Sequence, residues 1–176
     1  MSAINGDAGP AVDGGPHPIP VVELVPVTRD NWHEARLLGV RPDQETFTPP
    51  VIVSLAKMGI RPGGPDDEHR PYAVMADGVM VGFAELSGAF GSWETLWFGG
   101  FLIDARYQGR GLGAAALEAF VELARQEPGC RELGLTVVPE NEHARRLYRS
   151  HEFRSTGDLY EGEIVHRRRL EMAVPR

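Results

Sequence analysis

Residues 96–126 read LWFGGFLIDARYQGRGLGAAALEAFVELARQ. This stretch begins with an apolar run, 96–103, that is typical of a central strand buried on both faces. It continues through a glycine-rich turn into a segment, 111–127, whose apolar residues recur on one helical stripe and which Pro128-Gly129 ends. A second apolar run follows at 133–138. Residues 96–138 therefore predict a β-α-β unit with two parallel neighbouring strands.

The flanking sequence extends this unit on both sides. Asp77-Gly78 joins the apolar runs 72–75 and 79–86, which predicts an antiparallel hairpin because both turn residues tolerate positive φ. Further expected elements are a strand at 21–27, short helices at 32–38 (capped by Thr28 or Asp30) and 51–57, loops at 61–70 and 87–92, a helix opened by Asn141, and a strand at 163–172. Three arginines at 167–169 predict that this last strand is solvated and lies at a sheet edge. The alternation of strands and helices predicts a layered mixed α/β fold.

Length and charge limit the kind of protein this is. A chain of 176 residues fits one domain at 21–176, preceded by a loose tail at 1–20 in which eight of twenty residues are Gly or Pro. A net charge of −7 argues against nucleic acid or anionic lipid as a partner. There is no run of about 18 apolar residues and no leader-like start, and the one cysteine, Cys130, cannot form an internal disulfide. We expect a cytoplasmic protein that is not anchored in a membrane.

The glycine-rich turn is the first candidate binding site. Its residues, Gln108-Gly109-Arg110-Gly111-Leu112-Gly113, carry few side chains, so backbone N–H groups at the start of the following helix can point at a phosphate. A tight turn that needs glycines for its geometry alone is the alternative. A Walker-type loop is excluded because Ala114 follows Gly113, and a dinucleotide fingerprint is disfavoured because residues 104–108 separate the glycines from the strand.

Two motifs in the expected order resemble one enzyme family. The segment 108–113 matches the Gln/Arg-x-x-Gly-x-Gly/Ala signature of the GCN5-related N-acetyltransferases, and Asn141-x-x-Ala144-x-x-Leu147-Tyr148 with Phe153 resembles that family's next motif. Residues 99–108 are most similar to bacterial polyamine-type (spermine/spermidine) acetyltransferases, and Gln44-x-x-Phe47 with Ser54-Leu55-Ala56 supports the same branch. The resemblance implies a central mixed sheet of about six to seven strands, splayed between residues 96–103 and 133–138 and flanked by about four helices.

The resemblance also implies acetyl-CoA as the co-substrate. Its pyrophosphate would lie on the amides of residues 109–114, and its pantetheine arm would pair like a strand with residues 101–103 between the splayed strands. The implied cofactor-binding residues are Phe101, Leu102, Ile103, Gln108, Gly109, Arg110, Gly111, Leu112, Gly113, Ala114 and Asn141. We expect no metal, because the six histidines do not cluster and the sequence offers no multi-cysteine site.

Two residues are candidates for the chemistry. Tyr148 matches the family's general acid, which protonates the leaving thiolate of CoA; the alternative is a core tyrosine. Glu85 is the candidate base, because a carboxylate on the same strand face as Val81 and Phe83 is unexpected unless it is paired or faces a cleft; the alternative is a solvated strand end. Some relatives carry a glutamate where this chain has Thr136. A backbone N–H near residue 102 or 103 would hold the oxyanion.

The resemblance implies an N-acetyltransferase that acetylates a primary amine of a small molecule by direct attack in a ternary complex, because nothing places a histidine beside Cys130 to activate it. A polyamine is the first guess, since an acidic protein attracts a polycation. Acidic residues that could line the acceptor side are Asp43, Glu45, Glu85 and Glu94. Antibiotic amines, protein N-termini and a non-catalytic CoA-binding regulatory module are the alternatives, and the family often forms homodimers. This chain also departs from the family in having Glu152, not Gly, before Phe153.

Overall fold

A computed structural model describes residues 20–91 and 94–171, so the tail expected at 1–20 lies outside the described residues except for Pro20. The elements follow in the order β1 (Glu23–Pro26), α1 (Trp32–Ala35), the 3-10 turn η1 (Pro42–Gln44), α2 (Val51–Ile60), β2 (Glu68–Ala76), β3 (Val79–Gly88), β4 (Thr95–Ile103), the 3-10 turn η2 (Ala105–Tyr107), α3 (Leu112–Gln126), β5 (Glu132–Val137), α4 (Glu142–Ser150), β6 (Arg154–Tyr160) and β7 (Glu163–Arg169). The mixed α/β prediction is confirmed.

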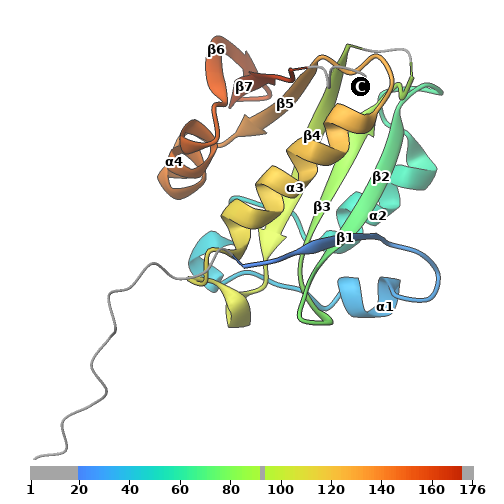
Figure 1. Cartoon of the computed structure of the whole chain (residues 1–176), viewed down its shortest axis with the longest axis vertical. Helices are drawn as coiled ribbons and strands as arrows, with labels where there is room; N and C mark the ends of the chain where they lie inside the picture. The colour runs from blue at the N-terminus through green and yellow to red at the C-terminus, as the bar shows by residue number, and fades with distance from the viewer. Residues whose placement is uncertain (1–19, 92–93, 172–176) are drawn as a thin grey trace, which may run out of the picture.

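The strands form one sheet in the order β1-β2-β3-β4-β5-β7-β6 (Figure 1). Neighbours pair antiparallel except β4 and β5, which are parallel as the β-α-β unit requires. The prediction that the last strand lies at an edge is wrong, because β7 sits between β5 and β6. Sequence analysis missed β6, whose residues are all exposed and lack the alternation that marks a half-buried strand.

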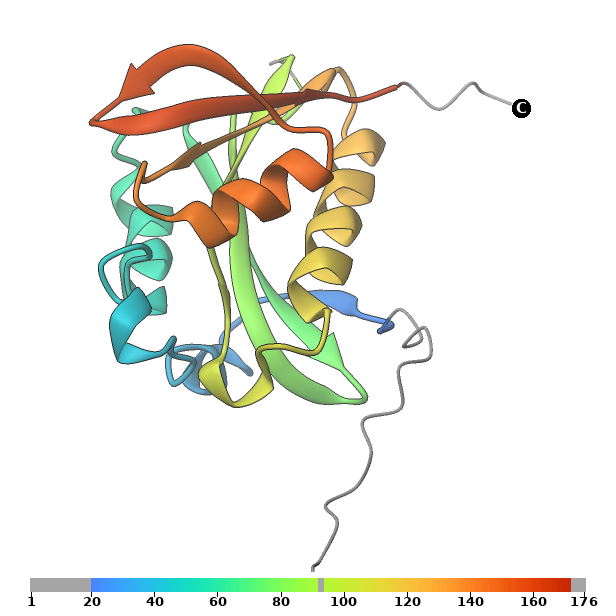
Figure 2. The same cartoon turned by 90° about the vertical axis from the view of Figure 1, so that its left-hand side faces the viewer.

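Helices cover both faces of the sheet (Figure 2). The apolar stripe of α3 packs with β3, β4, β5 and α4 in the larger core, which includes Phe98, Phe120 and Phe153. A smaller core on the opposite face holds residues of α1 and α2 against β2, β3 and β4, with Phe83 at its centre. Side chains of a strand alternate between faces, so each strand residue can be assigned to the α3 face or to the α1/α2 face.

The structure confirms the predicted hairpin turn and shifts the bounds of two other predicted segments. Asp77 and Gly78 have φ of 49° and 74°, so the hairpin turn is confirmed. The helix expected at 32–38 ends at Ala35, and its N-cap is Asn31 and not Thr28 or Asp30. The loop expected at 61–70 is shorter, because β2 begins at Glu68.

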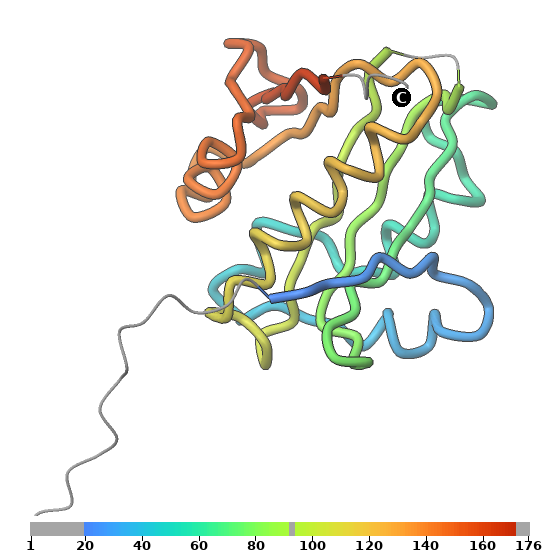
Figure 3. The backbone as a smooth tube through the Cα atoms, viewed as in Figure 1, coloured from blue at the N-terminus to red at the C-terminus, as the bar shows by residue number. Residues whose placement is uncertain are grey.

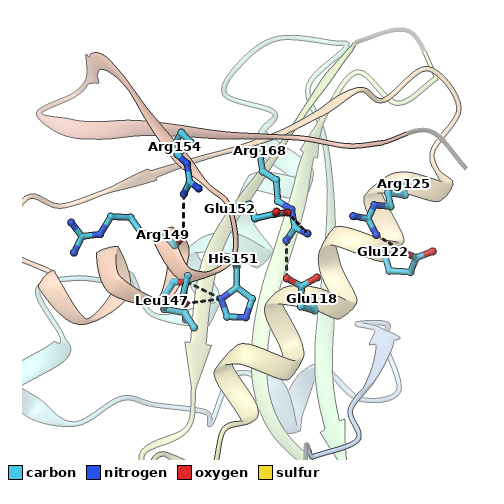
Figure 4. Close-up of polar contacts among 10 residues, drawn as sticks. Glu118, Glu122, Arg125, Leu147, Arg149, His151, Glu152, Arg154 and Arg168 are labelled. Carbon is cyan, nitrogen blue, oxygen red and sulfur yellow. Dashed lines mark hydrogen bonds and ion pairs between the residues drawn. The ribbon is translucent and has the colours of Figure 1, made fainter.

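Glu152 occupies the left-handed conformation that favours glycine, with φ of 65°. Its carboxylate lies 3.2 Å from Arg168 of β7, and the same guanidinium is 2.7 Å from Glu118 of α3 (Figure 4). Arg168 is only 7% exposed, so the solvated character expected of the three arginines is wrong for this one, whereas Arg167 and Arg169 are exposed as expected. These ion pairs of the buried Arg168 connect β7 and the end of α4 to α3, across the two parts of the sheet.

Candidate active site

The parallel strands β4 and β5 separate soon after they meet. They pair only at Thr95 with Glu132, Leu96 with Leu133, and Trp97 with Gly134. Beyond these pairs β5 turns away with β7, β6 and α4, which leaves one edge of β4 without a strand partner in the described part of the chain (Figures 1 and 3). The predicted splay between residues 96–103 and 133–138 is confirmed.

A bulge marks β4 at the start of this gap. The register of β3 and β4 shifts between Phe83 and Glu85, and Gly100 has φ of 60°. A Cβ atom at Gly100 would lie 2.6 Å from Ser54 Oγ of α2. Packing of α2 against the bulge is therefore sufficient reason for a glycine at 100.

The glycine-rich turn between β4 and α3 presents bare backbone. Gly109 and Gly111 have φ of 78° and 76°, a conformation that L-residues other than glycine rarely adopt. Gly111 is the N-cap of α3 and offers no side-chain cap, so the first N–H groups of the helix have no side-chain partner from it. A Cβ at Gly109 would meet nothing within 4 Å.

The polar side chains around this turn brace it. Gln108 Nε2 donates hydrogen bonds of 2.9 Å to Gln44 Oε1 and to the Ile103 carbonyl. Arg106 is bound to Asp104 at 2.7 Å, and Arg110 donates to the Arg106 carbonyl. Asp104 therefore fixes and neutralises Arg106, which is not a mobile charge for a ligand, and the bonds of Gln108 fix the shape of the loop.

Tyr148 lies on α4, the helix that faces the gap from the α3 side of the sheet. Asn141 caps α4 by accepting a hydrogen bond from the N–H of Ala144, so its side chain orients the helix. Tyr148 is buried against Phe153, and among the described residues its hydroxyl has no hydrogen-bond partner. Burial, and secondly the negative charge of Glu163, raise the pKa of Tyr148, which keeps the phenol protonated at neutral pH.

Glu85 lies on the opposite, α1/α2 face. It pairs in register with Gly99 of β4, and its side chain is 2% exposed, so the alternative of a solvated strand end is wrong. Lys57 of α2 lies 3.4 Å from one carboxylate oxygen and His69 of β2 lies 3.2 Å from the other. His69 also contacts Asp67 at 3.0 Å, and this bond helps to lower the pKa of Asp67 against the opposing effect of burial, which is the largest single influence.

The sequence predicted only Glu85 from this group of interacting side chains, which also includes Lys57, His69 and Asp67. It placed His69 in an acidic loop, whereas β2 begins at Glu68 and turns the His69 side chain inward. The register of β2 on β3, which brings His69 next to Ser87 and Pro71 opposite Glu85, is not visible in the sequence. One signal in the sequence could have placed His69 correctly: in a strand that extends to 69, His69 lies on the same face as the apolar Ala73.

A second carboxylate reaches the same face from the far side of the gap. Thr136 of β5 donates a hydrogen bond to a carboxylate oxygen of Glu163 at the start of β7. Leu135 and Val137 belong to the core under α3, so Thr136 points to the α1/α2 face. Glu163 was not among the predicted site residues.

Comparison with known proteins agrees with this geometry. The profile described as "Acetyltransferase (GNAT) family" matches residues 32–153, well over half of the chain. The chain belongs to the GNAT acetyltransferase family. It is accordingly an acetyltransferase whose acetyl donor is acetyl-CoA.

Individual relatives of this acetyltransferase are distant. It is 28% identical over 151 residues to a spermine/spermidine N(1)-acetyltransferase of Bacillus subtilis, an alignment that covers 82% of this chain and 95% of the relative. Its fold resembles a spermidine N-acetyltransferase from Vibrio cholerae in complex with CoA and spermine, with a TM-score of 0.63 and 16% identity over 83% of this chain and 92% of that one. An aminoglycoside acetyltransferase in complex with coenzyme A has a TM-score of 0.68 and 18% identity over 85% and 95% of the two chains.

The residues of this acetyltransferase fit acetyl-CoA. The bare turn at Gly109 and Gly111 can accept a diphosphate, and the unpaired edge of β4 beyond Trp97 offers backbone groups to the amides of a pantetheine arm. The described residues contain no group of three or more His, Cys, Asp or Glu side chains placed to hold a metal ion. None of the helices in the described part of the chain has the length and apolar character needed to cross a bilayer.

Proposed function

We propose that this acetyltransferase acetylates a primary amine of a small molecule by direct attack in a ternary complex, with a polyamine as the leading acceptor. One observation carries the proposal: a buried carboxylate, Glu85, and a buried phenol, Tyr148, lie on opposite faces of the sheet beside the gap between β4 and β5. Proton acceptor and proton donor are thus available on the two sides of a reacting thioester.

The proposed binding residues hold the co-substrate through the backbone groups of the protein. Amides of 109–114 grip the diphosphate, aided by the positive end of α3, and residues 101–103 pair with the pantetheine arm. When bound, acetyl-CoA supplies the thioester whose carbonyl carbon the amine attacks.

Tyr148 gives its proton to the departing thiolate. Attack of the neutral amine nitrogen forms the new C–N bond, and the C–S bond breaks as the thiolate leaves. The proton that the nitrogen then loses goes to Tyr148 and replaces the one that Tyr148 gives to sulfur. A thiol with a pKa of about 8.5 is a stronger acid than a phenol of about 10, and the pKa of Tyr148 is raised further, so the hydroxyl first donates a hydrogen bond to the charge developing on sulfur. Transfer of its proton becomes favourable because the more acidic proton of the acylated nitrogen replaces it.

Glu85 accepts the proton that the ammonium form of the acceptor loses. Gly99 carries no side chain, so nothing at that position separates the carboxylate from the gap; a Cβ there would lie 3.7 Å from Glu85 Oε1. Lys57 and His69 hold the two carboxylate oxygens in place. Proton transfer by such a positioned group contributes about 10²–10⁴-fold to a rate.

The oxyanion donor is the N–H of Ile103. The N–H of Asp104 donates to Val81 of β3, and successive N–H groups along a strand point to opposite edges. Of the two candidates, 102 and 103, the latter therefore faces the gap. Loss of one such donor in other enzymes costs about 10²–10³-fold in turnover.

An amine panel tests the proposal. The protein is incubated with acetyl-CoA and, separately, spermine, spermidine, an aminoglycoside and a peptide with a free N-terminus, while free thiol and acetylated product are measured. We expect thiol release with the polyamines to exceed that with the other acceptors. Release with none of the amines, or only with the aminoglycoside or the peptide, would contradict the polyamine assignment.

We also propose that the reaction takes place in the cytoplasm, since the one cysteine is a buried free thiol, and that residues 21–176 form a single domain. Homodimer formation is a further prediction, which sedimentation of the purified protein measures directly.

A further inference from the structure

Glu163 is a carboxylate at the gap that the protein itself leaves without a cation. No Lys, Arg or His in residues 20–91 and 94–171 lies within ion-pair distance of it; the partner described for it is the hydroxyl of Thr136. It is half buried, so water compensates its charge only in part. Glu85 differs, because Lys57 forms an ion pair with one of its carboxylate oxygens and His69 lies within hydrogen-bond distance of the other.

Pairing on one side and a side-chain hydrogen bond on the other bring the two carboxylates to the same level of the gap. Gly99 and Thr136 each lie two residues beyond the last β4–β5 pair, Trp97 with Gly134. Glu85 of β3 pairs with Gly99. Thr136 pairs with Val165 of β7, and the side chain of Glu163, two residues before Val165, reaches back to the Thr136 hydroxyl. Adjacent strands are about 4.8 Å apart, so β3 and β7 are separated by about 14 Å or more on this face. An extended acceptor lying across the gap can therefore reach both carboxylates.

The charge of Glu163 also acts on the proton donor. It helps to raise the pKa of Tyr148, which makes the phenol a weaker acid while Glu163 has no cationic partner. A cation bound at Glu163 offsets that charge. Binding of a positively charged acceptor would thus strengthen the donor at the moment when it is needed.

We propose that Glu163, held by Thr136, binds a positive charge of the acceptor on the α1/α2 face of the gap, so that the enzyme prefers acceptors with an ammonium group besides the reacting nitrogen. This inference rests on the proposed function, and it adds an acceptor-binding residue on β7 to the site. The linear, multiply charged amines meet this requirement, whereas a simple alkylamine does not.

The test compares spermidine with butylamine as acceptors for wild type, Glu163→Gln, Glu163→Asp and Glu122→Gln. Glu122 is an exposed residue of α3. Glu122→Gln removes the same charge outside the proposed site, so this variant serves as the matched control. We expect Glu163→Gln to raise the KM for spermidine at least tenfold while the KM for butylamine and for acetyl-CoA change less than twofold. Glu163→Asp should recover part of the loss, and Glu122→Gln should match wild type.

Equal changes for the two amines, or an unchanged KM for spermidine, would overturn the inference. Calorimetric binding of spermidine to CoA-saturated protein gives a readout that is independent of turnover. If wild type acetylates no amine, the proposed function fails, and the inference is still decided: weaker spermidine binding by Glu163→Gln than by wild type supports it, and equal binding or none in wild type contradicts it. Thermal melting confirms that each variant is folded.

Discussion

The two sides of the gap between β4 and β5 carry the same functional group in opposite surroundings. On the β3 side, Glu85 is almost fully buried and its oxygens face Lys57 and His69. On the β7 side, Glu163 is half buried and bonded to the neutral hydroxyl of Thr136. The difference indicates a division of labour: a carboxylate compensated by the protein has a fixed position, and one left uncompensated has binding capacity for a cation.

The largest expected effect on turnover is that of replacing Tyr148, the proposed proton donor. Tyr148→Phe removes the hydroxyl and keeps the ring against Phe153, so we expect kcat to fall about 100-fold or more. Affinity for acetyl-CoA, measured by calorimetry, should change little. An unaltered turnover number would remove Tyr148 from the acid role.

Stability separates the two carboxylates. Glu85→Gln leaves Lys57 and His69 without a buried counter-charge, and we expect the free energy of unfolding to fall by about 2 kcal/mol, besides the loss of turnover. For a chain of this size that lowers the melting temperature by roughly 4–8 °C. Glu163→Gln should change the melting temperature by less than about 2 °C. Similar melting temperatures for the two variants in a thermal scan would show that their surroundings do not differ in energy.

The pH dependence of stability reports on the Tyr148 side of the gap. The pKa of Tyr148 is raised in the folded protein above its ordinary value near 10, so the folded state retains a proton that the unfolded state loses. This contribution is fully present below pH 10 and disappears as pH rises through the raised value, and each pH unit in that window costs about 1.4 kcal/mol. Urea unfolding at pH 8 and pH 10.5 should show a steeper loss for wild type than for Tyr148→Phe. Parallel losses would place the tyrosine in a solvated setting.

The smallest effect concerns the hydroxyl that holds Glu163. Thr136→Val keeps the shape of the side chain and removes the donor, and we expect the KM for spermidine to rise about threefold, in line with one hydrogen bond worth about 0.6 kcal/mol. Steady-state kinetics with butylamine provide the comparison. A rise as large for butylamine as for spermidine would argue against a role for this hydroxyl in binding the distal charge.

Sequence reasoning reached the elements whose signals are local. The apolar run at 96–103, the helical stripe after Gly111 and the Asp77-Gly78 turn each depend on residues close together in the chain, and each is confirmed. The departure at Glu152 is visible in the sequence, but only the structure shows that Glu152 has a positive φ.

The parts that were missed depend on strand order and register. Insertion of β7 between β5 and β6 converts an expected edge strand into an interior one. The same insertion brings Glu163 to Thr136, across 27 residues of sequence. His69 meets Glu85 through the pairing of β2 with β3. No local pattern encodes these contacts, because they arise from how distant strands align.

The central claim is that bare amides at the start of α3 hold the diphosphate of acetyl-CoA. Calorimetric titration of CoA into Gly111→Ala and Gly78→Ala tests it, since both glycines have positive φ, 76° and 74°, and only the first lies at the turn before α3. Both variants should lose about 1 kcal/mol of stability. We expect Gly111→Ala to bind CoA about 30-fold more weakly than wild type, a change of about 2 kcal/mol, and Gly78→Ala to bind it normally. Equal CoA affinity in the two variants would show that the amides at the start of α3 do not hold the diphosphate.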